Sequence, residues 1–176
     1  MFEQGGGKPI ISLARFILSV ALAATPLAPV CAQSAFSNEA VLPYFSTQNI
    51  RPALEAEGAI AIEDDVSENG NAYVRATFDD NRIIVATPRA CGDDGQCRGL
   101  SLRAFWRTSP EMSEGELRTA IDQFNDNAVA LGQLFNRDTV VLSFYLIGDY
   151  GLAQGNLRVS TLVFLNNLDS LRRATQ

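Results

Sequence analysis

Residues 72–106 read AYVRATFDDNRIIVATPRACGDDGQCRGLSLRAFW, and this stretch decides the fold of the chain. Its first seven residues alternate between polar and apolar side chains, a pattern typical of a strand with one buried face. The polar run 79–81 predicts a turn, residues 82–87 predict the next strand, and Pro88 ends it. Residues 99–106 predict a further strand, one face of which carries Leu100, Leu102, Ala104 and Trp106.

Cys91 and Cys97 close a short loop between two of these strands. In an oxidising compartment, two cysteines at this spacing are expected to form a structural disulfide. Closing so short a loop stabilises a fold by roughly 2 kcal/mol in the chain-entropy account. Redox exchange is the alternative, but redox motifs usually read Cys-x-x-Cys beside a βαβ unit, and this spacing and context differ.

Two acidic residues, Asp93 and Asp94, lie inside the same loop. Carboxylates bind hard cations such as calcium, but two are too few for a site and the calcium-loop spacing is missing. A zinc site on the two thiolates would also need histidine, which the chain lacks. We interpret the pair as a solvated turn and predict no metal and no cofactor.

A helix is predicted before the strands. Ser46 and Thr47 offer hydroxyl groups that can cap it, although Pro52 allows it to begin as late as Asn49. Gly58 is a plausible helix stop. Residues 59–64 then begin the β-rich region, and an Asn-Gly turn separates them from the strand at residue 72.

A second helix is predicted after the strands, because Ser113 and Glu116 have the spacing of a capping box. It ends at 125–127. A second hairpin follows from residues 130–135 and 139–147.

Asn156 is predicted to cap a last helix that runs to about Arg173. The predicted order is therefore one helix, four short strands, a helix, two strands and a helix. This order indicates an α+β fold in which helices pack on an antiparallel sheet.

Residues 1–32 have the pattern of a secretory signal peptide. Lys8 and Arg15 supply positive charge, residues 16–24 are apolar, and small residues precede a cleavage site after Ala32. We predict a periplasmic or secreted protein in which residues 33–45 form a tether and 46–176 form the α+β domain.

Residues 1–32 have two alternative interpretations besides a cleaved signal peptide. A membrane anchor needs about 20 apolar residues, and this run is about half that length. Lipidation at Cys31 is the second alternative, but Val30 is not a residue that lipoprotein processing favours before the cysteine. We therefore predict no stable membrane insertion after cleavage.

Composition narrows the function classes. Removing Glu3, Lys8 and Arg15 leaves 19 acidic and 12 basic residues, so the mature charge is −7 by count. This charge argues against binding to nucleic acid and to anionic membrane surfaces. The mature chain also has no histidine and no lysine, which removes the usual general base, Ser-His-Asp and Cys-His arrangements and Schiff-base chemistry. We predict that the protein is not an enzyme and has no catalytic residues.

The last helix carries more apolar side chains than a single contact with a sheet requires. A buried position within the chain explains this pattern, and a dimer or partner surface is the alternative. The candidate interface residues are Leu162, Val163, Phe164, Leu165 and Leu168.

The stretch from about Thr47 to Arg173 resembles the YbjN family of bacterial sensory transduction regulators. The resemblance rests on the helix that ends in Glu57-Gly58, the acidic turn-rich strands, the Cys-x5-Cys loop, and the pair Phe124-Asn125, where the family tends to carry Trp-Asn. It implies a sandwich like that of type III secretion chaperones, which binds protein segments and often dimerises. It implies no enzymatic activity and no ligand residues.

Two functions follow from these features. The first is an exported, non-enzymatic protein that binds another polypeptide in the cell envelope, as a chaperone or a regulator. The second is a small-molecule or lipid sensor with a pocket between sheet and helix. Its expected lining is Phe105, Trp106, Phe124, Phe135 and Phe144.

Overall fold

The computed structural model describes residues 36–176, so the predicted signal peptide and its cleavage site lie outside the described residues. The elements are, in chain order, β1 (Val41–Leu42), α1 (Arg51–Ala56), β2 (Ala59–Val66), β3 (Ala72–Phe78), β4 (Ile83–Cys91), β5 (Cys97–Arg107), α2 (Glu114–Asn125), β6 (Leu131–Asn136), β7 (Thr139–Ile147), β8 (Leu152–Ala153) and α3 (Gln154–Thr175).

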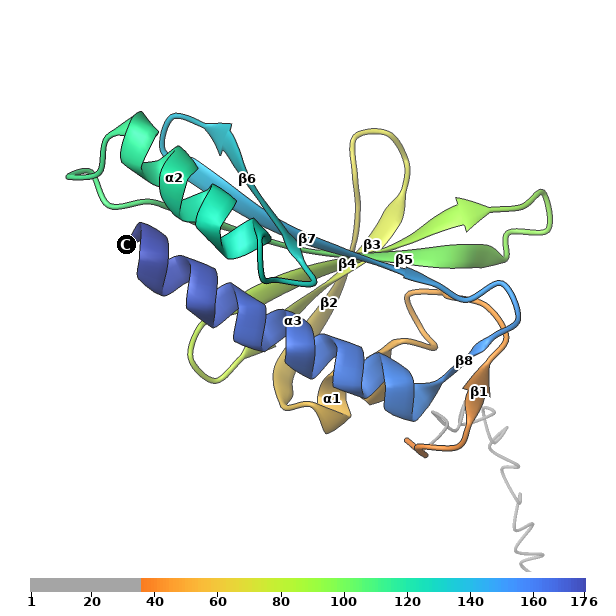
Figure 1. The fold of residues 1–176 in the computed structure, drawn as a ribbon. Coiled ribbons are helices and arrows are strands. Elements are labelled where there is room, and N and C mark those ends of the chain that lie inside the picture. The colour runs from red at the N-terminus through yellow and green to blue at the C-terminus, as the bar shows by residue number, and fades with distance from the viewer. Residues whose placement is uncertain (1–35) are drawn as a thin grey trace, which may run out of the picture. The chain divides into compact units, whose positions relative to one another are not determined.

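The α+β class is confirmed. Six strands form an antiparallel sheet in the order β2-β3-β4-β5-β7-β6. The helices gather on one side of it, with α3 running beside α1 and α2 (Figure 1). The strands β1 and β8, which the sequence did not predict, pair with each other in a separate two-stranded sheet.

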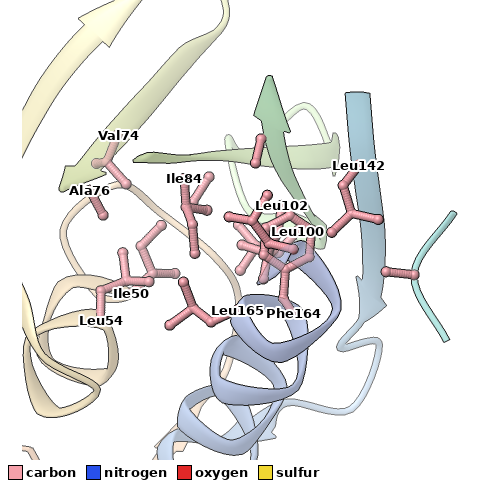
Figure 2. Packing of buried hydrophobic residues seen from close by; sticks show 14 of the residues in the cluster. Ile50, Leu54, Val74, Ala76, Ile84, Leu100, Leu102, Leu142, Phe164 and Leu165 are labelled. Atoms are coloured by element: carbon pink, nitrogen blue, oxygen red, sulfur yellow. The ribbon is translucent and has the colours of Figure 1, made fainter. Parts of the chain in front are cut away.

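The core lies between the helices and the inner face of the sheet. Side chains from β3, β4, β5 and β7 point toward α1 and α3 in Figure 2. Ile50, just before α1, and Leu54 of α1 lie on the side of Leu165 of α3, whereas Phe164 lies toward Leu100 of β5. The predicted inner face of β5 is confirmed, because Leu100, Leu102, Ala104 and Trp106 are all buried. Because neighbouring strands are paired in register with β5, the burial of this face of β5 also determines which face of each neighbouring strand points away from the helices.

The residues at the helix starts explain where the helices begin. Ser113 caps α2 in the predicted capping box, in which its hydroxyl accepts from the Glu116 amide while the Glu116 carboxylate accepts from the Ser113 amide. By contrast, α1 begins only at Arg51, because Ser46 and Asn49 bond each other's backbone amides and hold a turn before the helix.

The last helix begins at Gln154, so the predicted cap Asn156 lies inside its first turn and Ala153 takes the cap position. The Gln154 amide donates to the Ala40 carbonyl, and its side-chain oxygen accepts from the Ser37 amide. The helix start is therefore held by a distant part of the chain rather than by a local cap.

The tether predicted over 33–45 is corrected in its described part. Leu42 and Phe45 are buried in the core, and the Phe45 amide donates to the Cys97 carbonyl at 2.8 Å. The Phe45 ring also lies so close to Gly148 that a Cβ at that glycine would be 2.9 Å from it. Pro43 prevents a long regular strand but does not prevent the neighbouring side chains from packing.

The predicted disulfide is present. Cys91 and Cys97 are paired residues at the ends of β4 and β5, with their Cα atoms 3.7 Å apart and a bond between their sulfur atoms. The bond closes the hairpin loop beside the backbone bridge from Phe45 to Cys97.

Candidate functional site on the open face of the sheet

The outer face of the six-stranded sheet has no helix packed on it, and we call it the open face. Several of its apolar side chains are exposed, although Val141 on the same face is buried. Phe105 of β5 is 48% exposed and Phe135 of β6 is 70% exposed, and their rings meet edge to face with centroids 6.4 Å apart. Two exposed rings in contact form an apolar surface of the kind that marks interaction sites.

Strand β7, which lies between β5 and β6, adds two exposed apolar side chains to the same face. Tyr145 and Ile147 of β7 are 49% and 68% exposed. The Tyr145 side chain lies over the backbone of Gly99, where a Cβ would overlap its hydroxyl group. Only glycine fits at position 99, because the Tyr145 ring lies so close to its backbone. The ring covers the backbone at this position, where glycine has no side chain of its own.

Arginines interrupt the apolar surface. Arg103 and Arg107 are exposed on β5 on either side of Phe105, and Arg89 lies outward on β4. The salt bridges found among residues 36–176 use other arginines, namely Arg51, Arg82, Arg118 and Arg158. These three arginines of β4 and β5 are therefore available to a partner. A fourth, Arg75 of β3, also lies on the open face, but it is paired in register with Glu63 of β2.

The acidic residues of the open face are confined to its β2 edge. The outward positions of β4, β5, β7 and β6 carry no Asp or Glu, whereas β2 carries Glu63 and Asp65. Asp65 accepts a 2.6 Å hydrogen bond from the Tyr73 hydroxyl. This bond, with the Val66 amide and the nearby Arg75 charge, lowers the pKa of Asp65, and the same carboxylate raises the pKa of Tyr73.

A side chain occupies backbone groups of one residue on each edge strand of the sheet. At the edge strand β2, the Arg51 side chain donates to the backbone carbonyl of Ile62 at 3.1 Å and forms a salt bridge with Asp64. At β6, the Asn125 amide group bonds both the amide and the carbonyl of Gly132, at 2.8 Å and 3.0 Å. An added strand needs free edge groups, so these contacts favour the open face over the edges as a binding surface.

The interface predicted on the last helix is corrected for three of its five residues. Phe164, Leu165 and Leu168 are buried in the core, because α3 packs against the sheet and against both α1 and α2 and therefore needs a wide apolar stripe. Only Leu162, 42% exposed, and the half-buried Val163 lie where another molecule could reach them.

The five aromatic residues predicted to line one pocket do not gather around a cavity. Trp106 points into the core, whereas Phe105 and Phe135 are on the open face, because odd and even positions of a strand face opposite sides. Phe144 and Phe124 pack partly buried against the core.

Phe124 also lines a shallow groove of about 340 Å³ between α2 and α3. Its other lining residues are Gln123, Asn127, Ala128, Asn166, Asn167 and Ser170. Apart from the apolar Phe124 and Ala128, the side chains that line the groove are polar and uncharged. The groove therefore differs in chemistry from the apolar pocket that the sequence suggested.

The described residues hold neither a metal-binding cluster nor a membrane-spanning helix. Over residues 36–176, no cluster of three or more His, Cys, Asp or Glu side chains has the geometry to hold a metal ion. No helix in the same range is long and apolar enough to cross a membrane.

Sequence reasoning missed the open face. The signal was present in the strand at 99–106, where an outward phenylalanine, Phe105, lies between Arg103 and Arg107. Because the pocket hypothesis placed Phe105 and Trp106 together, it overlooked that adjacent strand residues point to opposite faces.

Taken together, the layers and the uncovered face define a two-layer α+β domain with one open sheet face. A crystal structure of an uncharacterized protein from Methanothermobacter thermautotrophicus is similar, with a TM-score of 0.55 and 15% sequence identity, over 74% of this chain and 96% of that chain. At this identity the likeness shows the fold alone. No family model matches the chain, and no curated protein matches it. The resemblance to the YbjN family stays a prediction.

Proposed function

We propose that this chain is an exported, non-enzymatic domain of the cell envelope, chaperone-like or regulatory, that binds another polypeptide on the open face of its sheet. The observation that carries the proposal is the exposure of Phe105, Phe135, Tyr145 and Ile147 on one continuous face. Exposed aromatic side chains that lie together are typical of protein interfaces, where they supply apolar contact at a small entropic cost.

The contacts at the edge strands support binding on the face rather than by strand addition. Arg51 and Asn125 already bond the backbone groups of Ile62 and Gly132 on the two edge strands. A partner strand that paired at these residues would first have to displace the two side chains. The open face needs no such rearrangement.

The proposal includes the finer fold assignment. A sheet with one helical layer and one free face is compatible with a sandwich like that of type III secretion chaperones and with membership of the YbjN family. Homodimerisation through Leu162 and Val163 of α3 is compatible with the same assignment.

A displayed library of random peptides tests the proposal. Peptides selected on the purified, oxidised protein are expected to protect β5 and β7 from hydrogen exchange and to lose about ten-fold or more in affinity when Phe105 and Ile147 are both changed to Ser. Val159→Ser on α3 is the matched control, because Val159 is also an exposed apolar residue, at 57%. Peptides that protect α2 and α3 instead, or a library that yields no binder, would overturn the proposal.

The groove between α2 and α3 favours a second candidate function, a small-molecule sensor. Its amide and hydroxyl side chains suit a polar, uncharged ligand rather than a lipid. Native mass spectrometry of the purified protein tests this function. A co-purified small molecule that is lost in Asn166→Ala would support it, and ligand-free protein with no thermal shift across a metabolite panel would count against it.

A further inference from the structure

The open face combines a positive charge with an apolar centre, on a chain that is acidic elsewhere. Of the described residues, 19 are acidic and 12 are arginines, by count along residues 36–176. Four neighbouring strands, β4, β5, β7 and β6, nevertheless carry no outward acids, and two of them, β4 and β5, carry the outward arginines. This separation of charge points to a partner that brings carboxylates to the face.

The spacing along β5 adds a pattern. Arg103, Phe105 and Arg107 occupy alternate positions on one strand and share the outer face. Alternate residues of a strand are separated by about 7 Å, and the same distance separates alternate residues of an extended peptide. A peptide lying along β5 therefore matches the row when it presents an acid, an apolar side chain and an acid at every second position.

We infer that the partner docks an extended segment of the form acid-x-apolar-x-acid on β5, with its carboxylates on Arg103 and Arg107 and its apolar side chain on Phe105. This inference rests on the proposed function and names the partner's chemistry. Arginine pairs with carboxylates through two parallel hydrogen bonds, which fixes the register of the segment.

Other occupants fit less well. A second copy of this chain that docked through its own open face would bring the same acid-free strands and would leave Arg103 and Arg107 without carboxylates opposite them. A nucleic acid carries a negative charge on every nucleotide, so the overall negative charge of the protein would repel most of the bound nucleic acid. A short acidic segment avoids this repulsion because its charges are limited to the two arginines.

The test uses three synthetic peptides with identical flanking threonines and the purified, oxidised protein. The first has the core Glu-Thr-Phe-Thr-Glu, the second scrambles the same residues as Glu-Glu-Thr-Thr-Phe, and the third replaces both acids with Gln. Fluorescence anisotropy measures each affinity at about 50 mM and about 300 mM salt, since binding through exposed charges weakens with salt. The first peptide is expected to bind about ten-fold more tightly than either of the others at low salt.

Two double variants locate the effect. Arg103→Gln/Arg107→Gln is expected to reduce binding of the first peptide to that of the Gln peptide. Arg172→Gln/Arg173→Gln removes the same charge from the end of α3, where neither arginine forms a salt bridge among the described residues, and is expected to leave binding unchanged.

The outcomes separate the inference from the proposed function. Equal binding of all three peptides that is lost in Phe105→Ser overturns the inference and leaves polypeptide binding on the open face intact. No binding tighter than about 1 mM for any peptide overturns both. Binding of oligonucleotides or anionic vesicles through Arg103 and Arg107, without peptide binding, replaces both with a different partner class.

Discussion

The indole nitrogen of Trp106 donates a 3.0 Å hydrogen bond to the hydroxyl of Thr175, and both residues are buried. This bond joins β5, the central strand below the open face, to the last turn of α3. The Thr175 hydroxyl in turn donates to the Leu171 carbonyl within the helix. A buried polar pair that is fully bonded fixes the position of the helix end against the sheet.

Thr175→Val is expected to lower the free energy of unfolding by about 1–3 kcal/mol, because it leaves the Trp106 N–H buried without a partner. Chemical denaturation followed by the fluorescence of this single tryptophan measures the loss. Thr161→Val is the matched control: Thr161 is equally buried in α3, but its hydroxyl bonds only the Leu157 carbonyl. Equal losses in the two variants would show that the indole bond contributes nothing.

Asn125→Asp is expected to destabilise the β6 edge by about 1–3 kcal/mol. The substitution replaces the N–H donor to the Gly132 carbonyl with a carboxylate oxygen, which repels it. Hydrogen exchange at the Gly132 amide, read with the free energy of unfolding, measures the change. Gln123→Asp adds the same charge at an exposed position of the same helix and should have little effect. Unchanged exchange at Gly132 in Asn125→Asp would contradict the role of Asn125 at this edge.

Replacing both cysteines, as Cys91→Ser/Cys97→Ser, is expected to lower the free energy of unfolding of the oxidised protein by roughly 2 kcal/mol. The loss arises because the open loop regains chain entropy in the unfolded state. Denaturation with and without reductant measures it, and the reductant should lower only the stability of the parent protein. A double serine variant as stable as the oxidised parent would show that the bond adds no stability.

Glu116 gives the domain an acid-sensitive helix cap. Hydrogen bonds from the Ser113 hydroxyl and amide lower the pKa of Glu116 below its ordinary value of 4.5. A carboxyl group whose pKa is lower in the folded state stabilises the fold above its unfolded pKa and loses that contribution as the pH falls through the folded value. The benefit of the charged form is therefore complete at neutral pH and absent in strong acid.

Glu116→Gln tests this cap, since glutamine keeps the acceptor oxygen but cannot ionise. The Tm of the parent is expected to exceed that of the variant at about pH 7, and the difference should shrink toward zero at about pH 3. Glu111→Gln removes the same charge outside α2 and serves as the control. A Tm difference that does not change with pH would contradict the role of the carboxylate.

Phe45→Ala is expected to cost about 3–5 kcal/mol, the range found when a large buried aromatic side chain is removed. Phe45 is 1% exposed and packs against Gly148. Thermal or chemical unfolding measures the loss, and Val41→Ala, which changes an exposed residue four positions earlier, should cost far less. A small loss at Phe45 would restore the view of this segment as a tether.

Local signals were enough to predict the main elements. Alternation of apolar residues placed the strand at 99–106 and its buried face, and the capping box placed the start of α2. The disulfide was also predictable, because its cysteines are neighbours across one hairpin. Each of these features depends on residues within a few positions of one another.

The candidate site was not predictable in the same way. Exposure of Phe105 depends on which side of the sheet the helices occupy, and the same residue would be a core side chain if a helix covered the outer face. Phe164 shows the converse, since an apparent interface residue is buried by the sheet.

The helices, the six strands of the main sheet and the disulfide follow from the sequence, because periodicity, caps and short loops act over short chain distances, whereas β1 and β8 do not. Only the tertiary structure decided that Phe45 belongs to the core, that Gln154 begins α3, and that one face of the sheet stays open. These features depend on contacts between residues far apart in the chain, such as Phe45 with Cys97 and Gln154 with Ala40. The physical reason is that burial is a property of the packed layers, and no single segment carries it.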